Sequence, residues 1–386
     1  MWTLKNENLA NKFLLGVFVL LISAPILRLD SRITDNTENR NLASFPTVDG
    51  NSLKSFPKEF EKYINDHFGF REALLDLHGR LSANLFNDSA SKRVIIGKNG
   101  WLFYTDEHSL EDIRRSDYLN EQDKLKWRAS ITEKDAWLAS QGIVYRFVVA
   151  PDKHSIYPEM LPSHVPIRPG KSRLQDLLDT IKLPATIVDL GEPLQRQKDI
   201  AGSRLYFRTD THWNSYGAYI GYKAIVHSLG EKYETTVLNL DDQAFHGTAD
   251  KHQRDLAIFA HLSDEESDQQ ADISRHIACQ RPGQPLLPMG LYVPQDHIFS
   301  VVCGSGIGTA LVFQDSFMNS IVPYLSSHFS RIVYVWHYPD ADFVVRMVRQ
   351  EKPQVVIEER LERGMRIVPE NDLTTALEKI NHINAP

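Results

Sequence analysis

Residues 309–317 read Thr-Ala-Leu-Val-Phe-Gln-Asp-Ser-Phe, an apolar run that ends in polar side chains. A short apolar run of this kind is typical of a strand that is buried on both faces. A helix is predicted directly after it, over 317–329. Ser316 would then lie at a strand-to-helix turn, with its hydroxyl at the sheet edge and backbone N–H groups facing a developing oxyanion. The alternative is an ordinary helix cap formed by Asp315 or Ser316.

Strands and helices alternate outward from this stretch in both directions. Further apolar runs and helical periodicities predict strands over 144–150, 185–190, 205–208, 331–336 and 354–357, and helices over 119–141, 171–182, 216–229 and 340–350. This alternation is typical of right-handed βαβ units, which build a parallel sheet with helices on both faces. The predicted fold class is therefore α/β, and a functional site is expected at the carboxyl ends of the strands.

Two features precede this region and one interrupts it. Apolar residues at helical spacing predict a helix over 60–85. Residues 94–104 carry apolar runs on both sides of Asn99-Gly100, which is the strongest short signal for a β-hairpin. The stretch from about 240 to 298 is polar and irregular, and we interpret it as a surface insertion.

The N-terminus carries an apolar segment. Residues 13–27 (FLLGVFVLLISAPIL) contain no charge and follow Lys5 and Lys12. The run is slightly shorter than the roughly 20 residues that span a bilayer, so it suits a signal-peptide core or a short anchor. Because no A-x-A cleavage site follows, we expect residues 1–29 to be an uncleaved membrane anchor and 30–386 to be the folded domain. The alternative is a helix buried in the protein core.

The composition excludes some classes of function. Apolar residues make up 42% and charged residues 24% of the 386 residues, as in an ordinary globular protein. The net charge of −7 and the absence of any Lys/Arg-rich block argue against a nucleic-acid partner. Cys279 and Cys303 lack the CxxC spacing of a zinc site. They form either one disulfide bridge or two buried thiols.

A base for Ser316 is found in the segment Thr209-Asp210-Thr211-His212-Trp213-Asn214, which follows another predicted strand. A serine hydroxyl is a weak nucleophile and needs a base, and an imidazole accepts and returns protons near neutral pH. Asp210, two residues before His212, can fix the tautomer of the ring. The alternatives are a surface pair beside a helix cap at Asn214, or a metal site for which no third ligand is evident.

Other segments offer weaker candidates. The run from Cys303 to Gly308 is neither a nucleophile elbow nor a P-loop, because its spacing differs from both. Lys153 follows the strand over 144–150 and either places a positive charge near the site or is solvated. Trp213 offers an aromatic face for a sugar, although such residues more often serve packing. Asp66, His67 and Arg71 lie in the predicted helical region, where a helix-end ion pair is expected.

Several short motifs together match a known family. The chain resembles the alginate O-acetyltransferase family of the AlgJ and AlgX type, which has an SGNH-hydrolase-like domain. The matching segments are Glu38-Asn39-Arg40 with Phe45-Pro46, Asp66-His67-Phe68-Gly69-Phe70-Arg71, Gly97-Lys98-Asn99-Gly100-Trp101-Leu102-Phe103-Tyr104, Pro151-Asp152-Lys153 with Ile156-Tyr157-Pro158-Glu159, Asp210-Thr211-His212-Trp213, and Asp315-Ser316-Phe317. They keep the family's order from about residue 38 to 360 and so cover most of the chain.

The resemblance implies a flavodoxin-like three-layer α/β/α domain in which the Asp and His precede the Ser. It implies Asp210, His212 and Ser316 as the catalytic triad, with no cofactor and no metal. Candidates for substrate contact are Lys153, Trp213, Asp315 and Gln314, the last of which stands where the family usually has glycine.

The resemblance also implies a bacterial periplasmic domain on a single-pass inner-membrane anchor, an exopolysaccharide acceptor, and a membrane-bound O-acyltransferase that supplies acetyl groups. The expected function is therefore an O-acetyltransferase that works through an acetyl-serine. Two alternatives stay open from the residues. One is an acetyl esterase that acts on a polysaccharide, and the other is a non-catalytic sugar-binding or scaffold subunit of a secretion complex.

Overall fold

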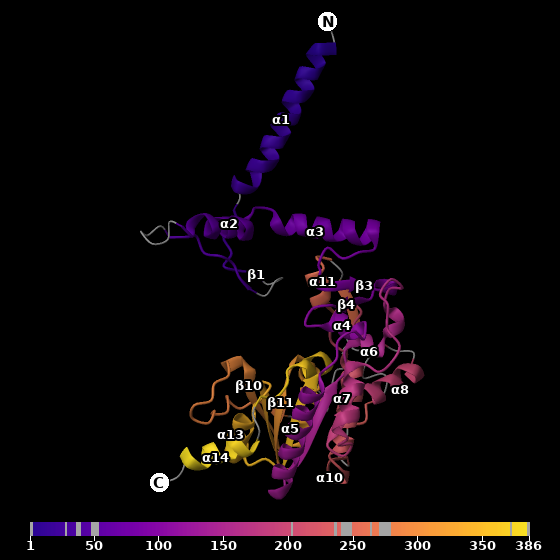
Figure 1. Cartoon of the computed structure of the whole chain (residues 1–386), viewed down its shortest axis with the longest axis vertical. Helices are drawn as coiled ribbons and strands as arrows, with labels where there is room; N and C mark the ends of the chain where they lie inside the picture. The colour runs from indigo at the N-terminus through magenta and orange to yellow at the C-terminus, as the bar shows by residue number, and fades with distance from the viewer. Residues whose placement is uncertain are drawn as a thin grey trace. The chain divides into compact units, whose positions relative to one another are not determined.

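The computed structural model describes residues 3–27, 29–35, 40–47, 54–201, 204–234, 238–240, 249–262, 265–269, 279–370 and 373–383 (Figure 1). The chain divides into two compact units. The first comprises Met1–Arg93 with Ala257–Ser263, and the second comprises Val94–Leu256 with Asp264–Pro386. The predicted boundary between 1–29 and 30–386 stays a prediction.

The first unit is built from short elements. They are α1 (Thr3–Leu27), β1 (Thr34–Asp35), β2 (Arg40–Asn41), α2 (Phe56–His67), α3 (Arg71–Leu81) and a π-helical turn, η1 (Ser82–Phe86). The prediction of one helix over 60–85 is wrong. The helix ends at His67 because Phe70 adopts a left-handed backbone with φ 65°, which an α-helix cannot accommodate.

The N-terminal segment of this unit is helical. The apolar side chains of α1 that are described, such as Phe13 and Leu20, are exposed. Among the residues that the structure describes, no helix is long and apolar enough to cross a membrane. The anchor expected at 1–29 therefore stays a prediction.

Asp66 and His67 contact the segment that precedes α2, and the helix-end ion pair expected for them with Arg71 stays a prediction. Both are buried. The carboxylate of Asp66 accepts the Ala43 N–H at 2.8 Å, and His67 Nε2 lies 2.9 Å from the Ala43 carbonyl oxygen. The pair therefore joins the end of α2 to the segment that precedes it.

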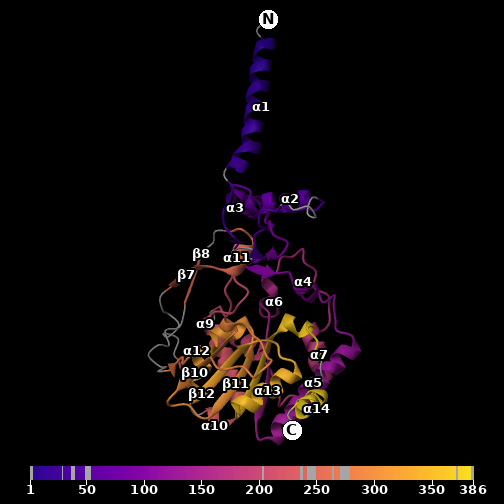
Figure 2. The ribbon, with the colours of Figure 1, turned by 90° about the vertical axis from the view of Figure 1, so that its left-hand side faces the viewer.

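The second unit is organised around a seven-stranded sheet. Its strands are β5 (Val144–Ala150), β6 (Ile187–Asp189), β9 (Cys279–Gln280), β10 (Ile298–Cys303), β11 (Thr309–Gln314), β12 (Arg331–Trp336) and β13 (Val355–Leu361). Their order is β6-β5-β13-β11-β12-β10-β9. The five strands from β6 to β12 run parallel, and β10 and β9 continue the sheet antiparallel. Figure 2 shows β10, β12 and β11 side by side.

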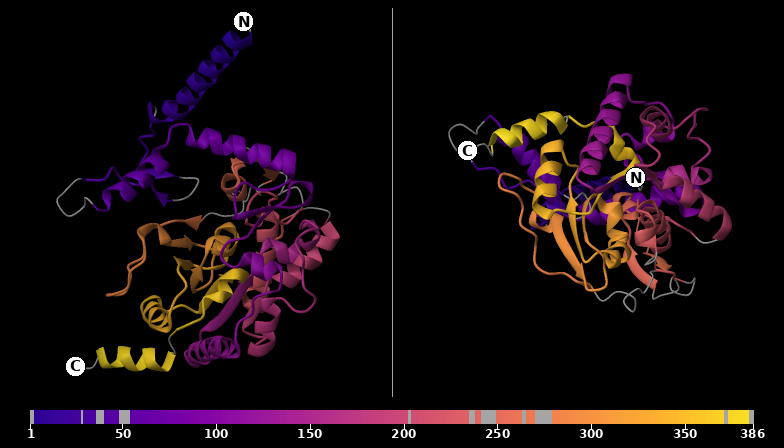
Figure 3. Two further views of the ribbon diagram at one scale, coloured as in Figure 1. Left: turned by 45° about the horizontal axis from the view of Figure 1, so that its top comes forward. Right: turned by 90° about the horizontal axis from the view of Figure 1, so that it is seen from below.

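Helices cover both faces of this sheet (Figure 3). The α-helices are α4 (Ser109–Ile113), α5 (Glu121–Ser140), α6 (Lys153–Ile156), α7 (Arg173–Ile181), α8 (Gly191–Ala201), α9 (Ser215–Ser228), α10 (Glu231–Glu234), α11 (Asp255–Phe259), α12 (Val322–Leu325), α13 (Ala341–Glu351) and α14 (Leu373–Ile383). The 3₁₀ turns are η2 (Lys98–Gly100), η3 (Pro158–Met160), η5 (Gln295–His297), η6 (Ser316–Ser320), η7 (Ser326–His328) and η8 (Glu362–Arg366).

Alternate strand residues feed two separate cores. On β11, Ala310 and Val312 belong to the core shared with α8, α9 and α12, whereas Leu311 and Phe313 belong to the core shared with α5, α7 and α13. This alternation follows from the two-residue period of a strand. The predicted α/β class, with a parallel sheet between two helical layers, is confirmed for this unit.

The hairpin expected around Asn99-Gly100 is confirmed. β3 (Val94–Ile96) pairs antiparallel with β4 (Leu102–Tyr104), and the turn between them is η2. Asn99 and Gly100 both have positive φ, at 55° and 77°. Asparagine and glycine tolerate this backbone best, which explains why the pair stands at the turn.

Two predicted elements are wrong. Residues 205–208 form no strand of the sheet, and only Tyr206 makes a single bridge, with Trp213. The helix expected over 317–329 is broken into η6, α12 and η7. Pro323 lacks the N–H that a continuous helix would direct at the carbonyl of residue 319.

The stretch from 240 to 298 lies partly outside the described residues, at 241–248, 263–264 and 270–278. Its described parts include the two-stranded pair β7 (Ala249–Gln253) and β8 (Glu265–Gln269), together with α11. A disulfide joins Cys279 on β9 to Cys303 on β10. The bridge settles the pairing that the sequence left open, and it removes Cys303 as a thiol nucleophile.

Candidate active site

Ser316 lies where β11 ends and η6 begins, at the carboxyl edge of the parallel sheet. Asp315 caps the turn, because its Oδ1 accepts the Phe317 N–H at 2.9 Å. The cap turns the chain sharply after β11 and leaves the Ser316 side chain partly exposed. The helix-cap alternative and the nucleophile hypothesis thus apply to neighbouring residues: Asp315 is the cap, and the hydroxyl of Ser316 is directed elsewhere.

The imidazole of His212 connects Ser316 to Asp210. His212 Nε2 lies 2.8 Å from Ser316 Oγ, and Nδ1 lies 2.7 Å from Asp210 Oδ1. Asp210 Oδ1 also accepts the His212 backbone N–H at 2.9 Å. A carboxylate accepts only, so the proton lies on Nδ1 and Nε2 is left to accept the serine proton. The structure brings the three predicted residues together in this hydrogen-bonded relay.

Burial and charge act in opposite directions on this relay. Burial alone raises the pKa of Asp210, but its hydrogen bond with His212 and the imidazolium charge outweigh burial and hold this pKa at about 2. Burial lowers the pKa of His212, but the hydrogen bond to Asp210 and the charges of Asp210 and Asp255 raise it further than burial lowers it. Asp210 is therefore a carboxylate at neutral pH, as an orienting group must be.

Asp255 is a member of the site that the sequence did not reveal. It is the first residue of α11, in the stretch that we interpreted as an insertion. Its Oδ1 accepts the Thr211 N–H at 2.7 Å, and its Oδ2 accepts the Thr211 hydroxyl at 2.5 Å. Oδ2 also lies 3.8 Å from His212 Nδ1. The imidazole therefore faces two carboxylates.

These contacts bear on the metal-site alternative, for which a third ligand was missing. Ligand atoms of Asp210, His212 and Asp255 lie within 4.8 Å of one another. However, 2.7 Å between Nδ1 and Oδ1 is a hydrogen-bond distance with the proton between the atoms, and Nε2 is directed at Ser316. Both ring nitrogens are thus engaged, and the arrangement favours a proton relay over a ligand set.

Lys153 holds the backbone that carries Asp210. Its side chain is buried, and Nζ donates to the carbonyl oxygens of Phe207, Arg208 and Asp210 at 3.3, 2.9 and 2.7 Å. The alternative of a solvated loop residue is wrong for Lys153, because these three carbonyls replace water around its charge. The positive charge does lie near the site, beneath the 207–210 turn.

Trp213 connects the histidine segment to the serine turn. Its side chain is buried, and Nε1 donates to the Phe317 carbonyl oxygen at 3.1 Å. Its ring packs edge to face against Phe317, with 5.1 Å between the ring centroids. Trp213 therefore fixes the turn that follows Ser316 relative to His212.

Gln314 and Asp315 are also buried and bonded to the protein. Gln314 Nε2 donates to Asn319 Oδ1 at 3.1 Å. Asp315 Oδ2 accepts the Tyr338 hydroxyl at 2.7 Å and the Leu361 N–H at 2.8 Å. Together with Lys153 and Trp213, these residues build the framework of the site, and a role in substrate contact stays a prediction for all four.

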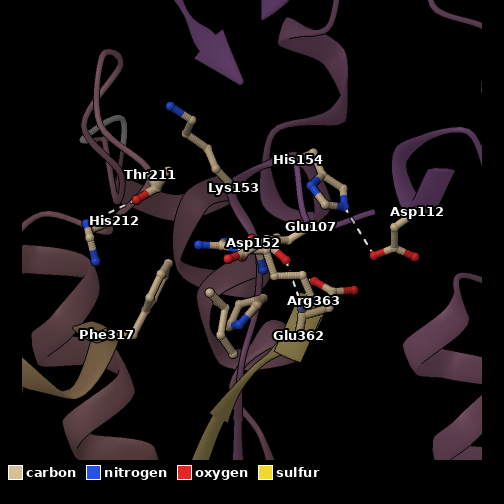
Figure 4. A network of polar contacts seen from close by, with 12 residues as sticks. Glu107, Asp112, Asp152, Lys153, His154, Thr211, His212, Phe317, Glu362 and Arg363 are labelled. Atoms are coloured by element: carbon tan, nitrogen blue, oxygen red, sulfur yellow. Dashed lines mark hydrogen bonds and ion pairs between the residues drawn. The ribbon is translucent and has the colours of Figure 1, made fainter. Parts of the chain in front are cut away.

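A second polar network lies where β5 and β13 end (Figure 4). The guanidinium of Arg363 pairs with Asp152 at 2.5 Å and with Glu107 at 3.0 Å. Glu362 Oε2 accepts the Asp152 N–H at 2.9 Å. Burial, followed by the charge of Asp112 and the smaller effect of Asp152, raises the pKa of Glu362 to about 8. Glu362 is therefore mostly a neutral acid at neutral pH.

Ser316 borders two cavities. One has a volume of about 440 Å³ and also contains the other relay residues, with Arg254, Asn319 and Tyr324 on its wall. The other has a volume of about 500 Å³, and Trp336 and Arg366 lie on its wall. A larger cavity of about 990 Å³ lies over α7, α8 and α9 and contains none of the relay residues. Ser316 therefore lines two cavities, and His212 and Asp210 lie on the wall of the smaller one.

A parallel sheet with a Ser-His-Asp relay at its carboxyl edge, with the acid and base before the serine in the chain, is the arrangement expected of a permuted SGNH-hydrolase-like domain. Residues 94–285 match the family described as "SGNH hydrolase-like domain, acetyltransferase AlgX". These residues lie largely within the second unit, which begins at Val94, and their match confirms the resemblance drawn from the sequence.

Curated relatives agree with this assignment. The chain is 29% identical over 210 residues to a probable alginate O-acetylase AlgJ of Pseudomonas fluorescens, which covers 53% of this chain and 50% of the relative. For the protein of the same name from Pseudomonas aeruginosa, the identity is 28% over 232 residues, covering 57% and 53%. The chain spans about half the length of the curated relatives it matches.

Among solved structures, the O-acetyltransferase domain of Pseudomonas putida AlgJ aligns with a TM-score of 0.45 and 19% identity. The alignment covers 75% of this chain and 99% of that domain.

Proposed function

We propose that this protein is an O-acetyltransferase that moves acetyl groups to hydroxyls of a bacterial exopolysaccharide through an acetyl-serine. The observation that carries the proposal is the relay in which His212 lies 2.8 Å from Ser316 and 2.7 Å from Asp210. Its support comes from the match of residues 94–285 to an acetyltransferase domain and from relatives named alginate O-acetylase. Alginate, a polyuronate, is accordingly the first acceptor to test.

The first half of the reaction forms the acetyl-serine. Ser316 Oγ attacks the carbonyl carbon of the acetyl donor while its proton passes to His212 Nε2. The imidazolium that forms is stabilised by Asp210. When the tetrahedral intermediate collapses, the bond to the donor breaks and the leaving group takes the proton from His212. The Phe317 N–H is bound to Asp315, so the Ser316 backbone N–H, at the start of η6, is the candidate for holding the oxyanion.

The second half reverses these proton transfers. A sugar hydroxyl gives its proton to His212 Nε2 and attacks the acetyl carbon. The Ser316 ester bond then breaks, and Ser316 recovers its proton from His212. Because the leaving group and the sugar exchange protons with the same nitrogen, both must enter beside His212, in the cavity of about 440 Å³.

The proposal also covers the cellular location of the domain and the source of its acetyl groups. We propose a periplasmic catalytic domain held at the inner membrane by the N-terminal segment, with a membrane-bound O-acyltransferase as the supplier of acetyl groups. The uncharged apolar run over 13–27 supports the anchor.

Two other functions use the same residues differently. An acetyl esterase would pass the acetyl group to water, which depends on how well the site excludes water. A non-catalytic subunit would have no need for the relay, and the 2.8 Å between Ser316 and His212 disfavours it.

The test compares the full-length wild type with Ser316→Ala, using a chromogenic acetate ester with and without alginate oligosaccharides. We expect the substitution to lower turnover on the order of a thousandfold or more. Acetylated oligosaccharide from the wild type supports a transferase, whereas acetate alone, unaffected by acceptor, supports the esterase. Ser140→Ala, on the exposed end of α5, is the matched control. Equal turnover by Ser316→Ala and wild type would remove Ser316 from the mechanism.

A further inference from the structure

We propose that Asp255 is a positioning residue that holds the Asp210–His212 turn in place and sets the pH at which His212 becomes a base. The proposal rests on the proposed function for its kinetic consequences, but its central test does not. Asp255 touches neither Ser316 nor any other reacting atom in the described contacts, so it acts through its neighbours.

The first observation is a reciprocal set of hydrogen bonds. The side chain of Asp255 accepts both the N–H and the hydroxyl of Thr211, at 2.7 and 2.5 Å. In return, the Asp255 backbone N–H lies 3.4 Å from Asp210 Oδ2. Thr211 is the residue between Asp210 and His212, so these contacts act on the centre of the turn. Asp255 thereby fixes the direction in which both flanking side chains point.

The second observation is the placement of charge. Asp255 Oδ2 lies 3.8 Å from His212 Nδ1, on the same edge of the ring as Asp210. Figure 4 shows Thr211 and His212 in contact, and the threonine hydroxyl lies 3.2 Å from Nδ1. A carboxylate at this distance from a partly desolvated imidazole favours the protonated ring.

Other charged groups also lie around His212. Asp210 acts in the same direction as Asp255, and Arg363, from η8, acts in the opposite direction. Arg254 lies on the wall of the same cavity. Phe317, from η6, packs its ring 4.8 Å from the imidazole and brings no charge.

The two carboxylates are not equivalent. Asp210 shares a direct hydrogen bond with the imidazole, and the pKa of this acid is held at about 2. The pKa of Asp255 is raised, by burial first and by the charge of Asp210 second. Asp210 fixes the tautomer because it lies 2.7 Å from Nδ1. Asp255 lies 3.8 Å from Nδ1, so it adds charge without a hydrogen bond to this nitrogen. Removal of Asp255 should change the basicity of His212 and leave the relay hydrogen bond in place.

The test is a titration of the His212 ring, followed by NMR in the full-length protein with labelled histidine, and a His212→Gln variant identifies the resonance. EDTA is present throughout. Asp255→Asn keeps the size of the side chain and removes its charge, so we expect the His212 midpoint to move to lower pH. Thr211→Val is the matched control, since it removes a hydrogen bond of Asp255 and no charge. An unchanged or raised midpoint in Asp255→Asn would overturn the proposal.

Turnover provides the second readout. The acid limb of the pH–rate profile should move to lower pH in Asp255→Asn, together with a fall of about tenfold in the plateau, because the turn loses part of its support. Asp255→Glu should restore the wild-type limb. A fall in the plateau with an unmoved limb would mean a structural role only and would contradict the proposal. If the wild type shows no turnover, the proposed function fails, while the NMR titration still decides the role of Asp255.

Discussion

The ammonium group of Lys153 lies 2.7 Å from the main-chain carbonyl oxygen of Asp210, the acid of the relay. The same group contacts two further carbonyls of this turn. A positive charge thus supports the backbone of a residue whose side chain must stay negative. On the side of Asp210 the contact uses only the backbone carbonyl, so the carboxylate of Asp210 stays available to His212.

Replacement of Lys153 by methionine should destabilise the protein and slow it. The change leaves buried carbonyl groups without their donor, which costs about 2–3 kcal/mol in the free energy of unfolding. We expect turnover to fall at least tenfold because the Asp210–His212 turn loses its support. Urea unfolding and ester turnover are the measurements. Lys126→Met, an exposed lysine on α5, should change stability by less than about 0.5 kcal/mol. Wild-type values for Lys153→Met would show that the contacts do not matter.

The Tyr338 hydroxyl supports the turn before Ser316 through Asp315 Oδ2. Tyr338→Phe removes this donor while the Leu361 N–H still reaches the same oxygen. We therefore expect a modest loss of about 1–2 kcal/mol and a several-fold lower turnover at unchanged overall structure. Thermal unfolding and kinetics measure both. Tyr292→Phe, on an exposed tyrosine, is the control and should behave as wild type. A larger effect from the control would refute the account.

The raised pKa of Glu362 predicts that the free energy of unfolding depends on pH. Its pKa is about 8 in the folded protein, against an ordinary value of 4.5. Between these values the unfolded chain releases the proton and the folded chain keeps it, so the free energy of unfolding falls as pH rises. Below 4.5 both states hold the proton, and above 8 both have released it.

Glu362→Gln keeps an acceptor for the Asp152 N–H and removes this ionisation. Relative to wild type, the variant should gain stability from pH 4.5 to 8, at a slope approaching about 1.4 kcal/mol per pH unit. Guanidinium unfolding at pH 4.5, 6 and 8 measures the difference. Glu121→Gln, at an exposed site on α5, should show no such slope. A stability difference that does not depend on pH would contradict the assignment of a neutral Glu362.

The Cys279–Cys303 bridge should contribute to stability and not to chemistry. It closes a loop with a sequence separation of 24, for which chain entropy predicts about 3.5 kcal/mol. The double variant Cys279→Ala/Cys303→Ala should therefore unfold at a lower temperature and keep its turnover below that temperature. Wild-type protein treated with reductant should follow the variant. Abolished turnover in a folded variant would reopen a role for these residues.

The sequence predicted the sheet and the relay for identifiable reasons. The apolar runs of β5, β11 and β12 are long and bounded by polar residues, and strand ends of a parallel sheet meet at one edge. Ser316 follows β11, so its place at this edge could be predicted, whereas residues 205–208 before His212 form no strand of the sheet. The family match supports the fold. The structure adds the distances between the relay atoms, which no sequence pattern gives.

Other features could not be predicted because long-range contacts determine them. Asp255 lies in a polar stretch without periodicity, so nothing local marks it as a neighbour of Thr211. Lys153 is buried because its partners are loop carbonyls more than fifty residues further along the chain. The helix break at Phe70 depends on a left-handed backbone that phenylalanine rarely adopts, so its sequence gives no warning.

The bridge between Tyr206 and Trp213 closes the segment that holds Asp210 and His212 into a small loop of its own. The spacing of acid and base is thereby settled within three consecutive residues, whereas Ser316 stands 104 positions beyond His212. The distance between His212 and Ser316 consequently depends on how two remote parts of the chain pack together. Two contacts join this loop to the end of β11, the Trp213–Phe317 hydrogen bond and the His212–Ser316 contact. A displacement of the loop from β11 would therefore break both contacts at once.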